Sequence, residues 1–235
     1  AKVRAQMPSD KLYPILLPNG RAIVAVFAFN YIETDIGTYG EVAVALPAVY
    51  GKKPASGSLA ALLEARYPGF GVLVYHLPVT KETARDAGRG QWGYTKFIAD
   101  MDFSFTPDYS RCQMYEENQL ILDLKVARRG YCLRDKNPLI TYSVLNGQLI
   151  KTTVAQQGIR CLSIRTNGSG MKLGDHPVSH SIRDLGIAER PMMACYYPER
   201  AGILPAGQVI ENAVRPLDGY PGKTRSARHR VVYLP

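Results

Sequence analysis

The alternation of apolar and polar residues along the chain predicts a protein built mainly from short β-strands. Residues 97–106 carry an apolar side chain at every second position, which is the period of a strand with one buried face. Residues 120–127 repeat that pattern and are expected to pair with them. Residues 21–29 are almost continuously apolar and β-branched or aromatic, which is typical of a strand buried on both faces. Residues 39–46 indicate a further core strand.

Shorter patterns complete the expected architecture. Further strands are expected at residues 13–18, 71–77, 139–144, 148–153 and 159–164, with turn signals such as Asn19-Gly20 between them. Short helices are expected at residues 59–66 and from Thr80 to a terminating Gly88. Many short strands with few helices favour a mainly β protein, and a closed antiparallel barrel in particular, because closure removes exposed sheet edges.

Composition indicates an ordinary globular chain. Its 235 residues are 46% hydrophobic and 21% charged, which fits a single well-cored domain over residues 1–235. No apolar run is long enough to span a membrane, and no apolar stretch follows the charges at residues 2–4 as in a signal peptide. We therefore expect no membrane association.

Cysteine usage indicates the compartment. The four cysteines stand singly, without the Cys-x-x-Cys spacing of zinc or redox sites: Cys112, Cys132, Cys161 and Cys195. Well-separated single cysteines are typical of reduced, packed side chains, so we expect a cytoplasmic protein.

Positive charge is concentrated near the C-terminus. The formal net charge is +9, and residues 215–235 contribute five positive side chains and one negative, or 5 − 1 = +4. This Pro/Gly-rich tail is interpreted as a solvated extension or an inter-subunit arm. Nucleic-acid binding is not expected, because Tyr220 and Tyr233 alone do not form a base-stacking platform.

The first candidate for chemistry is a lysine set among aromatic residues. Residues 88–97 contain the only tryptophan of the chain and place Lys96 between Tyr94 and Phe97. Desolvating an ammonium is costly, so an enclosed lysine tends to be a neutral amine, which forms imines with carbonyl compounds. The alternative is a lysine whose stem covers the aromatic rings and whose ammonium stays in water.

Glu41 is the second candidate, because it is the only charge within residues 39–46. One interpretation is a carboxylate at the edge of the core that pairs with Arg89. The other is a carboxylate near Lys96 that accepts and returns protons.

Two histidines four residues apart, His176 and His180, form a third candidate site. On a helix they could share a metal ion, with Pro177 in the first turn. The sequence offers no third ligand, so helix capping or a subunit contact is the favoured interpretation.

Three segments in order resemble the acetoacetate decarboxylase superfamily. Gly88-Arg89-x-x-x-Gly93-Tyr94-x-Lys96 is similar to its nucleophile segment, and Tyr39-Gly40-Glu41 to its Tyr-x-Glu motif. A third, weaker resemblance to the family runs from residues 173–176 through residues 203–210. Together the segments span roughly residues 20 to 212.

The resemblance implies a β-barrel that assembles into homo-oligomers, with the lysine in an apolar cavity. By this resemblance Lys96 would form a Schiff base with a small keto acid and Glu41 would carry protons. Tyr39, Gln91 and Trp92 would shape the substrate pocket. The implied activity is that of a carbon–carbon lyase, a decarboxylase-like reaction that needs no metal, nucleotide or vitamin cofactor.

The chain departs from the family pattern at several positions. Phe97 stands where decarboxylases carry a second lysine, Gly90 where Glu is common and Thr95 where Pro is common. Two alternatives therefore stay open. One is a Schiff-base aldolase–dehydratase that condenses pyruvate, or a similar keto acid, with an aldehyde. The other is a non-catalytic barrel that binds a small ligand.

Overall fold

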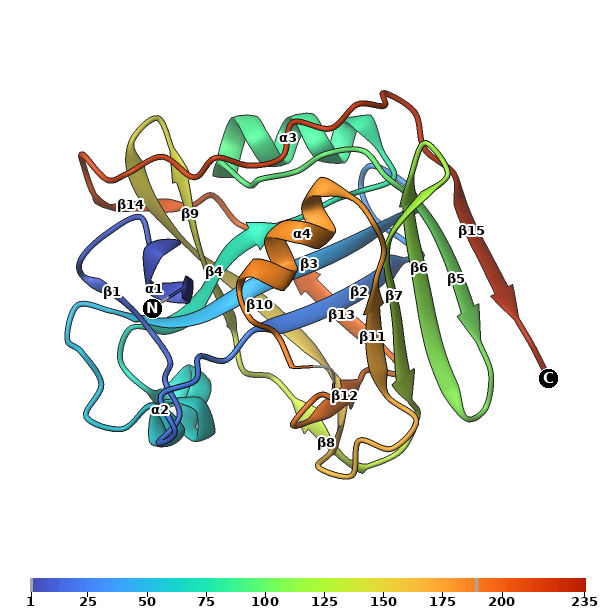
Figure 1. The fold of residues 1–235 in the computed structure, drawn as a ribbon, viewed down its shortest axis with the longest axis horizontal. Coiled ribbons are helices and arrows are strands. Elements are labelled where there is room, and N and C mark those ends of the chain that lie inside the picture. The colour runs from blue at the N-terminus through green and yellow to red at the C-terminus, as the bar shows by residue number, and fades with distance from the viewer. Residues whose placement is uncertain (1, 189) are drawn as a thin grey trace.

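Two β-sheets packed around a shared apolar core form the framework of the computed structural model, which describes residues 2–188 and 190–235 (Figure 1). The protein is mainly β with a few short helices, as the alternation predicts. The larger sheet holds β1 (Leu12–Pro14), β2 (Ala25–Tyr31), β3 (Tyr39–Tyr50), β4 (Phe70–His76), β8 (Tyr131–Asp135), β9 (Leu139–Leu145), β10 (Gln148–Ser163), β12 (Ala194–Tyr196), β13 (Arg200–Ile203) and β14 (Gln208–Glu211).

The smaller sheet and the helices cover this larger sheet. The smaller sheet holds β5 (Asp100–Phe105), β6 (Tyr109–Glu116), β7 (Gln119–Ala127), β11 (Gly170–Leu173) and β15 (His229–Tyr233). The helices are α1 (Lys2–Ala5), α2 (Gly57–Leu63), which continues as a 3-10 turn over Glu64–Arg66, α3 (Glu82–Trp92) and α4 (Pro177–Asp184). Pairing is antiparallel except for β4 with β9 and β5 with β15.

The expected closed barrel is wrong. Among the described residues the larger sheet runs β1-β3-β4-β9-β10-β12, with β2 attached only to β3 and β13 only to β10. The smaller sheet is also open, in the order β11-β7-β6-β5-β15. The strands bury their apolar faces by stacking instead: Val42 and Val44 of β3 pack in one core cluster with Phe103 of β5, Met114 of β6 and Ile182 of α4. Burial is thus achieved without closure.

Several expected elements are also corrected. The expected pairing of residues 97–106 with residues 120–127 is wrong, because an unpredicted strand, β6, lies between them. β6 pairs with β5 on one side and with β7 on the other. Many of the side chains of β6 are polar, so its sequence carries no clear apolar period. The two strands expected within residues 148–164 are one continuous strand, β10, which changes partners along its length. β2 is only half-buried, with Phe27 exposed.

The tail after residue 214 packs against its own chain. It runs beside α3 and then enters β15, which pairs in parallel with β5 (Figure 1). The Lys223 backbone N–H and the Tyr220 hydroxyl both donate hydrogen bonds to the buried Glu116 carboxylate, each at 2.6 Å. A freely solvated extension is therefore not what the structure shows.

α4 begins with a histidine cap. The Nδ1 of His176 accepts a hydrogen bond from the Val178 backbone N–H at 3.2 Å, and Pro177 occupies the first turn. The capping interpretation of His176 is thereby confirmed. The second histidine, His180, instead contacts Asp175 at the protein surface.

A disulfide links Cys132 of β8 to Cys161 of β10, at directly paired positions of the two strands. The expectation that all four cysteines are reduced is therefore wrong for this pair. Cys112 is a buried free thiol, and burial raises the pKa of the Cys195 thiol to about 11. The cytoplasmic location rested on reduced cysteines, so it stays a prediction without that support. No helix within the described residues has the length and apolarity needed to cross a membrane.

Candidate active site

Lys96 and Glu41 form a buried ion pair. The Lys96 Nζ donates to the Glu41 Oε2 at 2.7 Å, and the two side chains are only 6% and 9% exposed. They lie 55 positions apart in the chain. Of the two interpretations of each residue, the structure favours the enclosed lysine and the carboxylate beside it.

The short segment 77–80 brings the two residues together. On one side, the Val42 backbone N–H donates to the Pro78 carbonyl at 3.0 Å. On the other, the Val79 backbone N–H donates to the Phe97 carbonyl at 2.9 Å. The three segments thus run side by side, and the pair is held by backbone hydrogen bonds rather than by flexible loops.

α3 supports the stem of Lys96. The helix continues past the expected terminus at Gly88 and ends at Trp92, where Gly93 takes the left-handed conformation (φ 64°) that favours glycine as a cap. Gly88 serves a different purpose: a Cβ there would lie 2.5 Å from both Cδ and Cε of Lys96. The bare Cα of Gly88 is what lets the lysine stem pack against the helix.

Arg89 contacts the backbone of Lys96 and does not contact the Glu41 carboxylate. Its Nε donates to the Lys96 carbonyl at 2.5 Å, and an Nη donates to the Pro221 carbonyl at 3.0 Å. The interpretation in which Glu41 pairs with Arg89 is therefore wrong. Desolvation and then the nearby Arg85 charge lower the pKa of Arg89.

Tyrosines form one wall of the site. Tyr39, a predicted substrate-pocket residue, is buried and stacks on Tyr31 with 4.6 Å between ring centroids. The Tyr31 hydroxyl donates to the Glu41 Oε1 at 3.3 Å. Burial, followed by the Glu41 charge, raises the pKa of both phenols, so both stay protonated donors.

Sequence reasoning missed Tyr31, although a signal was present. Phe27, Phe29 and Tyr31 alternate along β2, so they share one face of the sheet. β2 pairs with β3 so that Phe29 lies opposite Glu41. A period-two reading of the hairpin would have placed these rings beside the carboxylate.

Trp92, the second predicted pocket residue, packs on another wall. Its ring stacks on Tyr94 with 6.3 Å between centroids, and its Nε1 donates to the Pro205 carbonyl at 2.7 Å. Tyr94 is buried, and its hydroxyl shares a hydrogen bond with the Thr141 hydroxyl at 2.8 Å. The segment that contains Pro205 thus joins the site through Trp92.

Gln91 and Phe97 are placed differently. Gln91, the third predicted pocket residue, is exposed on α3, so its contact with a substrate stays a prediction. Phe97 points away from Lys96 into the core between the sheets, where its ring meets Tyr220 edge-on. The position of the second lysine of decarboxylases is therefore filled here by a core side chain.

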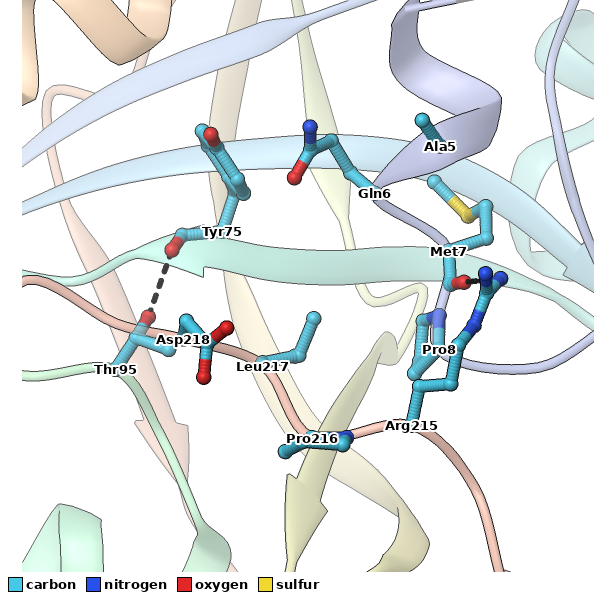
Figure 2. A pocket seen from close by; sticks show the side chains of 10 residues that line it. All are labelled: Ala5, Gln6, Met7, Pro8, Tyr75, Thr95, Arg215, Pro216, Leu217 and Asp218. Carbon is cyan, nitrogen blue, oxygen red and sulfur yellow. Dashed lines mark hydrogen bonds between the residues drawn. The ribbon is translucent and has the colours of Figure 1, made fainter.

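A separate cavity of about 170 Å³ lies behind the lysine segment (Figure 2). It is lined by the end of α1 and by the tail residues 215–218. Thr95 reaches into this lining, where its hydroxyl donates to the Tyr75 carbonyl at 2.9 Å. Neither Lys96 nor Glu41 lines this cavity, so it is distinct from the candidate active site.

No group of three or more His, Cys, Asp or Glu side chains within the described residues is arranged to hold a metal ion. The chemistry available at the site is that of a buried amine, a carboxylate and phenolic donors.

Comparison with known proteins identifies the family. The family profile described as acetoacetate decarboxylase matches residues 11–212, which is most of the chain. The chain belongs to the acetoacetate decarboxylase family. A search of curated proteins gives no match.

Solved structures show that the fold is that of the acetoacetate decarboxylase family. The chain resembles an acetoacetate decarboxylase from Legionella pneumophila subsp. pneumophila str. Philadelphia 1 with a TM-score of 0.65 at 15% identity, covering 89% of this chain and 80% of that one. A structure from structural studies of acetoacetate decarboxylase has a TM-score of 0.66 at 16% identity, with coverage of 90% and 82%. An acetoacetate decarboxylase-like enzyme from Sphingomonas wittichii RW1 has a TM-score of 0.57 at 14% identity, with coverage of 90% and 86%. Identities this low support the fold and leave the reaction to be argued from the site.

Proposed function

We propose that this protein is a Schiff-base carbon–carbon lyase that acts on a small keto acid, with Lys96 as the nucleophile and Glu41 as the proton carrier. Membership of the acetoacetate decarboxylase family supports a decarboxylase-like reaction in general. The observation that carries the proposal is the buried contact of 2.7 Å between the Lys96 amine and the Glu41 carboxylate. A lysine enclosed with a single carboxylate can become neutral by passing its proton over one hydrogen bond.

In the first step, Glu41 takes a proton from the Lys96 ammonium. The neutral amine attacks the ketone carbon to give a carbinolamine. The Glu41 carboxylic acid then gives its proton to the carbinolamine hydroxyl, which leaves as water and yields a protonated imine. The positive imine nitrogen withdraws electrons, so the bond from the adjacent carbon to the carboxylate can break. Carbon dioxide leaves and the bonding pair remains as an enamine.

In the second half, the Glu41 carboxylate takes up a proton from solvent and delivers it to the enamine carbon. Water then hydrolyses the imine, which releases the ketone and restores the amine. Tyr31 donates to Glu41 and stays protonated, so it helps to hold the carboxylate in place while the proton moves. Tyr39 and Trp92 would limit the pocket with apolar ring surface, and the net charge of +9 would attract an anionic substrate.

The test is reductive trapping. The protein is incubated with acetoacetate or with pyruvate, borohydride is added, and mass spectrometry locates the adduct. We expect a stable adduct on Lys96, and its loss in Lys96→Arg, which keeps the charge but not the nucleophile. Circular dichroism of the variant controls for folding.

Carbon dioxide release separates the reaction types. An adduct together with carbon dioxide from acetoacetate supports decarboxylation, whereas an adduct without carbon dioxide points to the aldolase–dehydratase reaction. Absence of any adduct over a range of keto acids would overturn the proposal and favour a non-catalytic binder.

A further inference from the structure

Arg200, at the start of β13, lies close to the candidate active site although it is far from it in the chain. Its guanidinium carbon is 5.0 Å from the centroid of the Phe29 ring and 5.3 Å from that of Tyr197. β13 and β2 therefore approach each other through this side-chain contact. Their backbones do not pair, because β2 pairs with β3 and β13 pairs with β10. The half-buried Arg200 thus fills the gap between the two strands.

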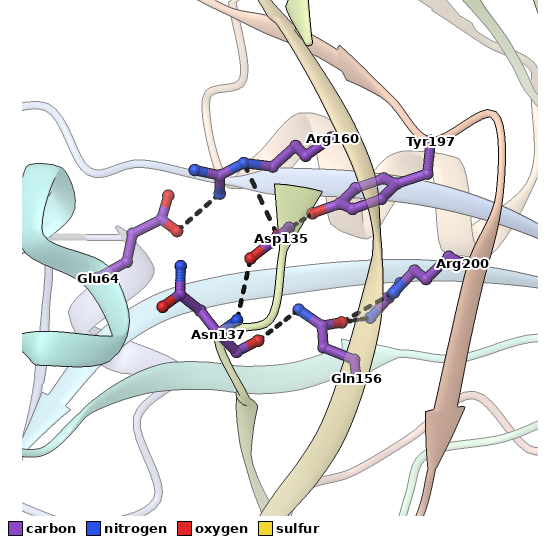
Figure 3. Close-up of polar contacts among 7 residues, drawn as sticks. All are labelled: Glu64, Asp135, Asn137, Gln156, Arg160, Tyr197 and Arg200. Atoms are coloured by element: carbon purple, nitrogen blue, oxygen red, sulfur yellow. Dashed lines mark hydrogen bonds and ion pairs between the residues drawn. The ribbon is translucent and has the colours of Figure 1, made fainter. Parts of the chain in front are cut away.

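The hydrogen bonds of Arg200 leave its charge unneutralised. Both its Nε, at 2.8 Å, and an Nη donate to the Oε1 of Gln156, a neutral amide. The Gln156 Nε2 donates in turn to the Asn137 carbonyl at 2.8 Å, which orients the amide oxygen toward the guanidinium (Figure 3). No ion pair within the described residues includes Arg200.

Arg160, in the same close-up, shows the contrasting case. Its guanidinium contacts the Glu64 carboxylate at 3.0 Å and the Asp135 carboxylate at 3.8 Å (Figure 3). Asp135 also accepts a hydrogen bond from the Tyr197 hydroxyl at 2.9 Å. These two carboxylates are therefore engaged with Arg160, and among the described residues no carboxylate forms an ion pair with Arg200.

A short series of contacts joins Arg200 to the reacting lysine. Phe29, under the guanidinium, stacks on Tyr31 with 5.8 Å between centroids, and Phe29 lies directly opposite Glu41 in the hairpin of β2 and β3. Directly paired residues of an antiparallel pair project from the same face. Arg200 therefore stands over the same face as the Lys96–Glu41 pair, separated from it by about one aromatic side chain.

We propose that Arg200, held by Gln156, binds a carboxylate of the substrate that is retained through the reaction. The inference deepens the proposed function, on which its substrate class rests: the substrate is a keto acid with an acid group several carbons away from the ketone that Lys96 attacks. For a decarboxylation this means a keto diacid, and for an aldol cleavage a keto monoacid suffices.

The reason for a retained carboxylate is electrostatic. A guanidinium bound to a carboxylate stabilises the anion, and carbon dioxide is neutral. If Arg200 held the departing carboxylate, it would stabilise the ground state more than the transition state and would slow the reaction. A cation at a distance from the imine instead anchors the substrate without opposing the bond that breaks.

The anion site is tested first without any chemistry at Lys96. Trp92 is the only tryptophan and packs in the same apolar cluster as Phe29, so its fluorescence reports binding. Pentanoate and the uncharged 1-pentanol are titrated against the wild type and Arg200→Gln. We expect the variant to bind pentanoate about tenfold more weakly or worse, with 1-pentanol unchanged.

Three further variants sharpen this titration. Gln156→Glu supplies Arg200 with an internal carboxylate and is expected to weaken pentanoate binding as much as Arg200→Gln does. Arg200→Lys keeps the charge and should restore part of the affinity. Arg134→Gln, which removes an exposed arginine of β8, makes the same change in net charge and should bind pentanoate like the wild type. Equal pentanoate affinity in the wild type and Arg200→Gln would overturn the proposal.

Reductive trapping then links the anion site to the reaction. With levulinate, a keto acid, and 2-pentanone, its uncharged counterpart, Arg200→Gln should require about tenfold more levulinate for half-maximal trapping and an unchanged amount of 2-pentanone. If neither compound is trapped by the wild type while pentanoate still distinguishes Arg200→Gln, the anion site stands and the lyase proposal fails. If the wild type is trapped and Arg200→Gln needs no more levulinate than the wild type, the lyase proposal stands and the anion site fails.

Discussion

Two buried carboxylates in this protein each contact a basic side chain, and their surroundings differ. Glu41 meets the Lys96 amine at 2.7 Å, and Glu116 meets the Nε2 of His176 at 2.9 Å. Both carboxylates lie at the ends of strands that face core clusters, and both partners come from distant segments. Distance and burial alone therefore do not distinguish the proposed reacting pair from the Glu116–His176 pair.

The Glu116 carboxylate accepts three hydrogen bonds. Besides His176, the carboxylate accepts hydrogen bonds from the Tyr220 hydroxyl and the Lys223 backbone N–H. Burial alone would raise the pKa of Glu116, but these hydrogen bonds together lower it. Because the His176 Nδ1 accepts from Val178, its Nε2 is the ring nitrogen left to donate. Three donors thus hold this carboxylate, and two of them tie the tail to the core.

The Glu41 carboxylate accepts fewer hydrogen bonds than that of Glu116. Its carboxylate accepts from Lys96 and, at 3.3 Å, from Tyr31. A lysine ammonium has three N–H donors, and within the described residues Lys96 uses one of them in a hydrogen bond. Unfilled hydrogen-bonding capacity, and not burial, therefore distinguishes the proposed reacting pair from the Glu116 site.

The largest effect is expected from Glu41→Gln, which keeps the shape of the side chain and removes its capacity to carry a proton. We expect the rate of reductive trapping to fall by about 10²–10⁴-fold. We expect only a modest loss of stability, because the glutamine amide oxygen can still accept the hydrogen bond from the Lys96 amine. Trapping time courses and urea unfolding measure the two quantities. A wild-type trapping rate in Glu41→Gln would show that Glu41 does not carry the proton in the reaction.

Glu116→Ala should show the reverse pattern. It leaves the Tyr220 hydroxyl, the Lys223 N–H and His176 without their shared acceptor. We expect the free energy of unfolding to fall by about 3–5 kcal/mol. Trapping at Lys96, measured at a temperature where the variant is folded, should stay near the wild-type rate. A stable variant that has lost its trapping activity would contradict the structural role.

Acid should lower the free energy of unfolding through the buried His76. Burial lowers the pKa of His76 from 6.5 to about 4. The unfolded chain then binds more protons between these values, so stability rises with pH over that window and falls as the pH drops from 6.5 toward 4. The loss from this group is roughly 3 kcal/mol. Unfolding measured from pH 4 to pH 7 should show a shallower slope in His76→Gln, and an unchanged slope would contradict this assignment.

The smallest effect comes from two glycines of one helix. In Gly88→Ala the new Cβ would displace the stem of Lys96, and we expect trapping to slow by about tenfold. Gly90→Ala is the matched control, because a Cβ at Gly90 meets open space. It should leave trapping unchanged and add roughly 0.5–1 kcal/mol of stability, since alanine is the better helix former. Equal trapping rates in the two variants would show that Gly88 does not position the lysine.

Local patterns in the sequence predicted much of the fold and singled out Lys96 and Glu41 as separate candidates. The alternation over residues 97–106 correctly indicated a strand, and the aromatic surroundings of Lys96 correctly indicated an enclosed amine. The sequence does not reveal β6, because its polar side chains obscure the apolar period. The sequence also predicts the wrong helix end at Gly88, because capping glycines and close-packing glycines look the same in a sequence.

The chain by itself determined which segments become strands and which side chains share a face, because both follow from a period of two residues. Only the tertiary structure decided that Lys96 meets Glu41, that Phe97 is turned into the core, and that Arg200 reaches the Phe29 ring. Those contacts depend on hydrogen bonds through the segment 77–80 and on the curl of a sheet that does not close. Contacts between distant segments leave no period in the sequence, so local pattern could not reveal them.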